Sequence, residues 1–262
     1  MDCFAQMDVN IFGEFIKQIG GFYASYGESI ISCGLTREEF HQCIADDTIW
    51  QKWQSFLLKE LHVRMIQINI EYLQNDPVLC QSVISPPSPL PSPPPKSEDD
   101  PSSSTSASSV AATLPFPQEG IRLSAVHTFL DLCGGVEMLH NMTTTEVNNE
   151  ALMPLTFAYK ASYCGLLDKQ RQEKDALRAT VCPKTEEEAA RAAGAVLNKP
   201  CAFISHAWKY QFLDVLDAIE THFEGEQRET MREESDESKG VIIWFDLFTN
   251  NQHLAPDLDF HW

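Results

Sequence analysis

The chain has 262 residues, a length that suits one large domain or two small ones. Hydrophobic residues make up 43% of it, and its net charge is −19. Phosphate backbones and anionic lipids repel such an acidic chain, so nucleic acid and membrane surfaces are disfavoured as partners. The N-terminus lacks the basic and apolar regions of a signal peptide, and no apolar run reaches the roughly 20 residues of a membrane span. The sequence therefore predicts a cytoplasmic protein.

Residues 1–84 are predicted to form a helical module. Apolar residues recur at three- and four-residue steps over Asn10–Tyr23, and Thr36 with Glu39 matches a capping box that opens a further helix. A continuous apolar stripe at helical spacing then covers Ile49–Leu73. This pattern favours the core of a small helical bundle, and the alternative is a helical face that binds a partner.

Residues 85–117 are predicted to be a disordered linker. The segment holds most of the 15 prolines of the chain together with many serines and almost no apolar residues. Such a composition cannot bury enough surface to offset the entropy lost on ordering. Pro86–Pro89 and Pro91–Pro94 both fit the PxxP pattern that SH3-type domains bind. The alternative function of the linker is that of a passive spacer.

Residues 121–199 are predicted to be helical again. A second capping box begins at Thr143 and opens a helix through Leu152, which Pro154 interrupts or kinks. A third capping box begins at Thr185 and opens a helix that ends near Asn198.

The last part of the chain, residues 200–262, has the pattern of a strand–helix–strand unit. Cys201–Ser205 and Val241–Phe245 are short, uninterrupted apolar runs, and Lys209–Phe223 between them is an amphipathic helix. Uninterrupted apolar strands are typical of parallel sheets that are covered on both faces. We therefore expect the two runs to be neighbouring central strands of a parallel sheet.

A set of short motifs between residues 141 and 262 resembles one known family. The motifs are Thr143–Val147, Pro154–Thr156, Phe203–Trp208 (Phe-Ile-Ser-His-Ala-Trp), Phe212–Leu216, Ile243–Asp246 (Ile-Trp-Phe-Asp) and Asn250–His253 (Asn-Asn-Gln-His). Together they are similar to a divergent TIR-like (Toll/interleukin-receptor-like) group found in large multidomain eukaryotic proteins. Cys201 and His206 stand where ordinary TIR domains have an aspartate and a tyrosine.

The resemblance implies a flavodoxin-like α/β fold, which is a doubly wound sheet of about five parallel strands. Residues 200–262 hold two of those strands, so the expected fold is an incomplete TIR-like sheet, and a truncated gene product or a fragment is the simplest explanation. In catalytic TIR domains a glutamate on a later helix, within a Trp-Cys-x-x-Glu stretch, splits NAD. The printed sequence reaches Trp262 without such a stretch. We therefore expect no NAD hydrolysis by this chain.

Candidate binding residues follow both predicted strands, because ligands of open parallel sheets bind beyond the carboxyl ends of the strands. Ser205, His206 and Trp208 follow the first strand, and Asp246 and Asn250 follow the second. Trp208 is suited to stack on a nicotinamide or adenine ring, or to cap the core. His206 is suited to donate a hydrogen bond to a ligand or to pack locally. Asp246 is suited to hold a ribose hydroxyl or to brace the loop, so NAD is the candidate ligand.

Other chemistries have weaker patterns. The eight cysteines include no CxxC pair, so they are expected to be reduced thiols. His253, Asp257, Asp259 and His261 lie close together in the sequence, but without regular helical spacing they indicate a polar loop more than a metal site. No GxSxG elbow or glycine-rich phosphate loop accompanies the first strand.

The predicted function is that of a TIR-like signalling or scaffold fragment. It would bind protein partners or self-associate through the TIR-like region without catalysis. The alternative is an NAD-hydrolysing TIR-like enzyme once the domain is complete.

Overall fold

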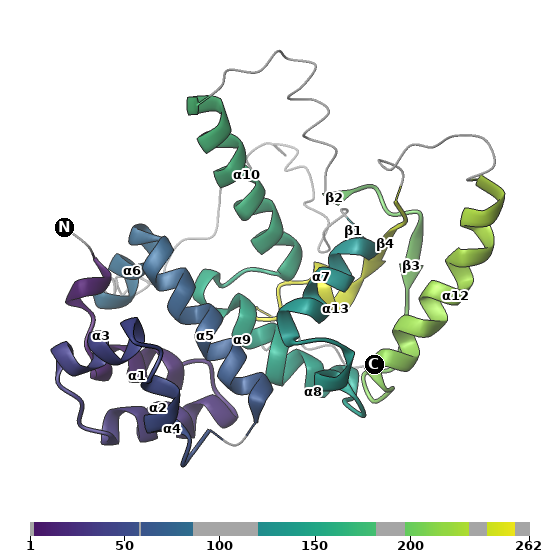
Figure 1. Ribbon diagram of the computed structural model, residues 1–262. Coiled ribbons are helices and arrows are strands. Elements are labelled where there is room, and N and C mark those ends of the chain that lie inside the picture. Colours follow the sequence, from purple (N-terminus) through teal and green to yellow (C-terminus); the bar gives the residue numbers. More distant parts are fainter. Residues whose placement is uncertain (1–2, 58, 86–119, 182–196, 231–239, 255–262) are drawn as a thin grey trace, which may run out of the picture.

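The protein is mostly helical and contains one small mixed sheet (Figure 1). The computed structural model describes residues 3–57, 59–85, 120–181, 197–230 and 240–254. The predicted linker, apart from Ser85, and residues 185–196 of the predicted helix Thr185–Leu197 lie outside these ranges. The end of that prediction was wrong, because Leu197 and Asn198 form a strand. No helix in the described ranges combines the length and the apolar character that crossing a membrane requires.

The N-terminal residues form a bundle of short helices. Its elements are η1 (Phe4–Gln6), α1 (Val9–Lys17), α2 (Phe22–Ser32), α3 (Arg37–Ala45), α4 (Ile49–Trp53), α5 (Glu60–Asn75) and α6 (Pro77–Ile84). The predicted apolar segment Asn10–Tyr23 is divided between α1 and α2, because Gly20 and Gly21 take φ angles of 86° and 54°. The stripe predicted over Ile49–Leu73 is likewise split into α4 and α5.

The capping box predicted at Thr36 is confirmed. The Thr36 hydroxyl accepts a hydrogen bond from the backbone N–H of Glu39, and the Glu39 carboxylate accepts one from the Thr36 N–H. Both bonds satisfy N–H groups that the first turn of α3 leaves without an intrahelical partner.

A chain of short helical elements links the bundle to the sheet. It comprises α7 (Leu123–Cys133), η2 (Val136–Leu139), α8 (Thr144–Val147), the π-helix η3 (Asn148–Leu152), α9 (Met153–Thr156), η4 (Phe157–Tyr159) and α10 (Tyr163–Val181). Pro154 does not end the helical run, which continues through η3 into α9, but the run is distorted into a π-helix just before the residue that lacks an N–H. The wide π turn before it adjusts the register of the helix instead.

The sheet has four strands in the order β2-β1-β4-β3. The strands are β1 (Gly120–Arg122), β2 (Leu197–Asn198), β3 (Ala202–Ile204) and β4 (Ile242–Phe245), with α12 (Phe212–Thr230) between β3 and β4 and α13 (Asp246–Thr249) after β4. The predicted strand–helix–strand unit is confirmed, because β3 and β4 pair in parallel with Phe203 beside Trp244.

Two expectations about this sheet were wrong. It is not purely parallel, because β1 pairs antiparallel with β4 and with β2. β3 is not a central strand, because among the described residues it lies at the end of the sheet. The pattern missed β1 because a three-residue strand carries almost no periodicity. Gly120 allows the close pairing, since a Cβ there would lie 2.6 Å from the carbonyl oxygen of Ile243.

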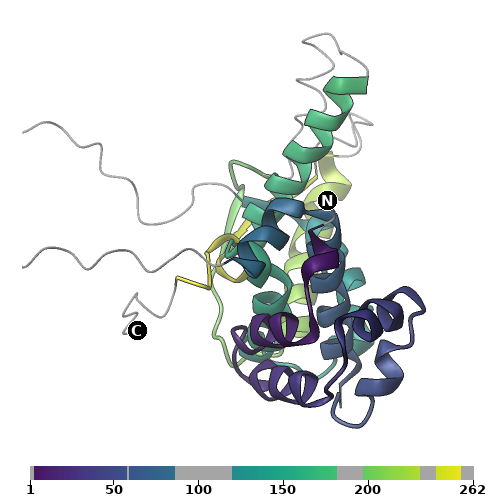
Figure 2. The ribbon, with the colours of Figure 1, turned by 90° about the vertical axis from the view of Figure 1, so that its left-hand side faces the viewer.

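The two faces of the sheet differ. Ile121, Ile243 and Phe245 point into the hydrophobic core that the helices cover. Phe203 points to the opposite face and is 68% exposed. Figure 2 shows the N-terminal helices gathered at the lower end of the molecule, with α10 rising from the upper end. Trp244, which stacks on Phe203 on this face, is only 7% exposed, so the high exposure is that of Phe203 itself.

One hydrophobic core runs from the bundle to the sheet. Phe15 of α1 packs edge-on against Phe157 with ring centroids 5.4 Å apart. The Asn69 amide of α5 donates to the carbonyl of Pro154 at 3.1 Å. The N-terminal bundle therefore packs against the segment 148–157.

Candidate functional site

His206 and Asp246 meet at the carboxyl ends of β3 and β4, as the parallel pairing requires. The His206 Nδ1 lies 3.4 Å from Asp246 Oδ1. Neither ring nitrogen of His206 has a partner with hydrogen-bond geometry, so the contact is electrostatic. The His206 side chain is only 3% exposed, whereas that of Asp246 is 24% exposed. The pair therefore joins the two strand ends with the carboxylate nearer to the solvent.

Burial sets the protonation of this pair. It lowers the pKa of His206, and the nearby Asp246 carboxylate opposes that shift in part. Burial also raises the pKa of Asp246, against the effects of His206 and of the Leu247 N–H, which donates to Oδ1 at 2.8 Å. The imidazole packs edge-on against Phe245, with ring centroids 5.0 Å apart. A neutral imidazole is the form that this apolar setting favours.

The other three predicted site residues lie around the pair. Ser205 is exposed, and Trp208 is half-buried with its ring centroid 5.7 Å from that of His206. The Asn250 backbone N–H donates to the carbonyl of Asp246 at 3.1 Å. The structure thus brings His206, Trp208 and Asp246 together, and it joins Asn250 to them through the backbone.

The loop after β3 is held by the helix α8, an arrangement that sequence analysis missed. The backbone N–H groups of Thr144 and Thr145 donate to the carbonyls of Tyr210 and Trp208 at 2.9 and 3.0 Å. The Thr145 hydroxyl donates to the Trp208 carbonyl as well. The predicted capping box of Thr143 and Glu146 is confirmed within the same turn. Residues of the loop therefore satisfy N–H groups that the start of α8 leaves free.

A second link joins the motif Pro154–Thr156 to the motif Asn250–His253. The Thr156 hydroxyl lies 2.9 Å from His253 Nε2, and the Asn251 amide donates to the carbonyl of Lys160 at 2.8 Å. Burial, and next the charge of Lys160, lower the pKa of His253 to about 4. Burial also lowers the pKa of Lys160 to about 8. This neutral histidine serves to fix the segment after α13 against α9.

A buried polar chain crosses from the bundle to the π-helix. The Tyr26 hydroxyl lies 2.9 Å from His62 Nδ1, and His62 Nε2 lies 3.2 Å from the Glu150 carboxylate. The same carboxylate accepts from Lys59 at 2.5 Å, and the Glu150 carbonyl accepts from Tyr23 at 2.8 Å. Helical periodicity gives no signal for such a network, because its members are far apart in the sequence.

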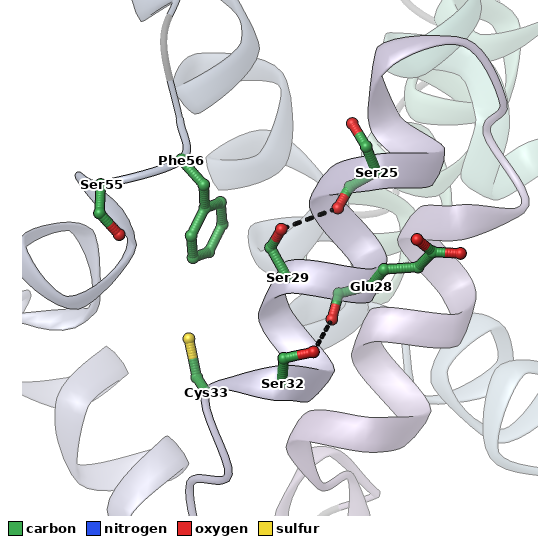
Figure 3. A pocket seen from close by; sticks show the side chains of 7 residues that line it. All are labelled: Ser25, Glu28, Ser29, Ser32, Cys33, Ser55 and Phe56. Atoms are coloured by element: carbon green, nitrogen blue, oxygen red, sulfur yellow. Dashed lines mark hydrogen bonds between the residues drawn. The ribbon is translucent and has the colours of Figure 1, made fainter.

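A shallow hollow of about 490 Å³ lies on the bundle, away from the predicted site (Figure 3). Its lining residues are Ser25, Glu28, Ser29, Ser32, Cys33, Ser55 and Phe56. The Ser29 and Ser32 hydroxyls donate to carbonyls of their own helix at 3.0 and 2.8 Å. Burial raises the pKa of the Cys33 thiol, which makes it a poor nucleophile. This lining contains no nucleophile with an adjacent base.

The contact between His206 and Asp246 is better suited to holding the ends of β3 and β4 together than to binding a nucleotide. The covered ring nitrogens of His206 do not face the solvent, so they offer no hydrogen bond to a dinucleotide on the surface. Asp246 keeps an accessible carboxylate that suits a ribose hydroxyl. Within the described ranges no three His, Cys, Asp or Glu side chains form a metal-binding group, and Asp257, Asp259 and His261 lie outside those ranges.

Comparison of the chain with protein-family models, with curated proteins and with solved structures gives no match. The fold and the site geometry therefore carry the functional interpretation.

Proposed function

We propose that this chain is a TIR-like assembly protein whose sheet region self-associates or binds protein partners, without catalysis of its own. A finer flavodoxin-like architecture is part of the same proposal. The parallel pairing of β3 with β4 and the connecting helix α12 are compatible with it. The antiparallel strand β1 departs from it.

One observation carries the proposal, namely the end of the sheet at β3, beyond which no further strand pairs among the described residues. Phe203 on β3 is 68% exposed and stacks face to face on Trp244, with ring centroids 4.2 Å apart. Soluble proteins usually protect such an edge with charges, proline or a covering element, because its backbone groups pair readily with another chain. β3 itself, Ala202–Ile204, contains none of these residues. An exposed aromatic on an apolar edge favours association.

The interior of the site supports assembly rather than chemistry. His206 is enclosed by Phe245 and Asp246, and α8 ties down the loop that follows. These contacts hold β3 in place at the edge of the sheet. A rigid edge loses little entropy when a partner binds, which favours affinity.

The test is the mass of the purified chain in solution from about 1 to about 200 µM, measured by light scattering after size exclusion. We expect the average mass to rise with concentration. A constant monomer mass over the whole range, with no binding to a TIR-like partner domain, would contradict the proposal. The enzymatic alternative has its own readout, because nicotinamide released from NAD by the purified chain would show catalysis.

A further inference from the structure

We propose that His206 is a pH-sensitive switch: its neutral ring keeps the loop after β3 (Ser205–Gln211) bound to α8, and protonation of the ring releases that loop. This inference goes beyond the proposed function, because release of the loop requires neither a partner nor a second copy. Three features of the structure support it, namely the burial of the ring, the shortage of acceptors around it, and the hydrogen bonds between the loop and α8.

The ring of His206 is enclosed without a hydrogen-bond partner. Its side chain is 3% exposed, and neither Nδ1 nor Nε2 has a partner within the part of the chain that the structure describes. A neutral imidazole has one N–H group, whereas an imidazolium has two and carries a full charge as well. An enclosed N–H group without an acceptor costs more free energy when it is charged. The enclosure therefore disfavours the protonated ring.

The nearby carboxylate of Asp246 compensates for only part of this cost. Its Oδ1 lies 3.4 Å from His206 Nδ1 and already accepts the Leu247 N–H at 2.8 Å. Nε2 has no acceptor at all among the described residues. Burial accordingly lowers the pKa of His206, and the charge of Asp246 opposes that shift in part. The ring thus stays neutral at pH values just below 6.5, where an exposed histidine is mostly charged.

The other elements packed against His206 add little charge. Phe245 of β4 and Trp208 of the loop contact its ring through their own aromatic rings. Glu146 of α8 is exposed and is engaged in the capping box of that helix. Lys209 lies in the same loop and is exposed to solvent. Burial and the neighbouring carboxylate therefore dominate the protonation of His206.

Hydrogen bonds to α8 distinguish a bound from a released loop. The Thr144 and Thr145 N–H groups donate to the carbonyls of Tyr210 and Trp208 at 2.9 and 3.0 Å, and the Thr145 hydroxyl donates to Trp208 at 2.9 Å. The His206 ring reaches water only when this segment moves outward, and that movement breaks these bonds. The released state binds the additional proton, so its population rises as the pH falls.

Asp246 acts in the opposite sense at lower pH. Burial raises its pKa, so protonation of this carboxyl favours the bound loop. An exposed imidazole titrates at about 6.5 and an exposed carboxyl at about 3.9, so the effect of the histidine comes first as the pH falls. The contribution of neutral His206 is complete above about pH 6.5 and is lost below it. We therefore expect release between about pH 6.5 and about pH 5.

Hydrogen exchange in dilute protein tests the switch. Between about pH 7.5 and about pH 5, opening at the Thr144 and Thr145 amides should rise by at least about threefold, after correction for the intrinsic exchange rate. The upper limit is about 30-fold, which is set by protonation at pH 5 of a free imidazole with a pKa of about 6.5. The Phe40 amide, which donates to Thr36 in the first turn of α3, is the internal control and should change much less.

Two variants separate the switch from a general effect of acid. His206→Gln keeps a polar side chain without the titration and retains His253, so opening at Thr145 should change by less than about twofold over the same range. Asp246→Asn removes the charge that favours the imidazolium, so the rise should be at least as large as in the wild type.

The sign of the wild-type response decides the inference. Opening at Thr144 and Thr145 that stays constant or decreases as the pH falls would overturn the switch, because the contact with Asp246 would then outweigh burial. An equal rise in the wild type and in His206→Gln would also overturn it. Should His206→Gln fail to fold, the NMR titration of the His206 ring decides, since a midpoint above pH 6.5 overturns the switch and one below supports it. These measurements are made without association, so the proposed function stands or falls separately.

Discussion

The N-terminal bundle and the sheet satisfy their backbone groups in opposite ways. In the bundle each helix satisfies most of its own N–H and C=O groups, and side-chain caps such as Thr36 satisfy others at the helix start. In the sheet each strand depends on a neighbour, and β3 has a described neighbour on one side alone. Under the proposed function, the capacity for association lies in the strand that lacks a second described neighbour.

The tightest packing in the bundle gives the largest expected effect. α1 and α2 cross at Gly13 and Gly27, where a Cβ on Gly27 would lie 2.4 Å from the carbonyl oxygen of Gly13. Gly27→Ala must push the helices apart, and we expect it to lower the free energy of unfolding by about 3 kcal/mol. Chemical denaturation measures the change. The control is Gly165→Ala, whose nearest neighbour would be 3.4 Å away and which should not destabilise the protein.

The contact between bundle and π-helix should give the next largest effect. Glu150→Ala leaves the buried His62 Nε2 without its acceptor, and we expect a loss of about 2 kcal/mol in the free energy of unfolding. Glu150→Gln, which retains an acceptor, should lose less. The exposed pair of Glu14 and Lys17 is the control, because Glu14→Ala should change stability by less than about 0.5 kcal/mol. Equal effects of Glu150→Ala and Glu14→Ala would show that the polar chain is not structural.

Low pH should lower the stability of the protein through protonation of His253. Its pKa is about 4 in the folded protein and about 6.5 in an unfolded chain, so the unfolded chain binds more protons between these values. The stabilising contribution is complete above about pH 6.5 and is lost as the pH falls toward 4. Between about pH 6.5 and pH 4, the melting temperature of His253→Gln should therefore fall less than that of the wild type.

Asp246 acts in the opposite sense, because burial raises its pKa and a protonated carboxyl favours the folded state at low pH. It is present in both the wild type and His253→Gln, so the comparison isolates the histidine. Identical pH profiles for the two proteins would refute the role assigned to His253.

The two capping boxes give the smallest effect and the most direct comparison of the regions. Thr36→Ala in the bundle and Thr143→Ala beside the sheet should each cost about 1 kcal/mol of unfolding free energy. Thr143→Ala should in addition speed amide exchange at Thr144 and Thr145, whose N–H groups bind the loop after β3. Hydrogen exchange followed by NMR distinguishes the two variants. Unchanged exchange at both threonines would contradict the coupling between α8 and the loop.

Local signals predicted part of this structure well. Both capping boxes and the parallel pair of β3 and β4 follow from side-chain chemistry or from short apolar runs. The meeting of His206 with Asp246 follows from that pairing. Structural features that depend on partners far away in the sequence were missed. β1 is too short to show a period, and the contact of His62 with Glu150 spans 88 residues.

The exposed edge was mistaken for a buried strand for a physical reason. Residues Ala202–Ile204 are apolar, and an apolar run reads the same whether another strand or helix covers it or not. Only the sheet order and the exposure of Phe203 reveal the difference. The same ambiguity applies to His206, where sequence alone left both ligand binding and local packing open.

Hydrogen exchange at the edge of the sheet tests the central claim most directly. The outward-facing amide of Phe203 should exchange quickly in dilute protein and become protected as the concentration rises to about 200 µM. Amides of the bundle, such as those of α5, should keep the same protection throughout. Exchange at Phe203 that does not depend on concentration, in a sample whose mass shows association, would contradict the claim that β3 is the assembly surface.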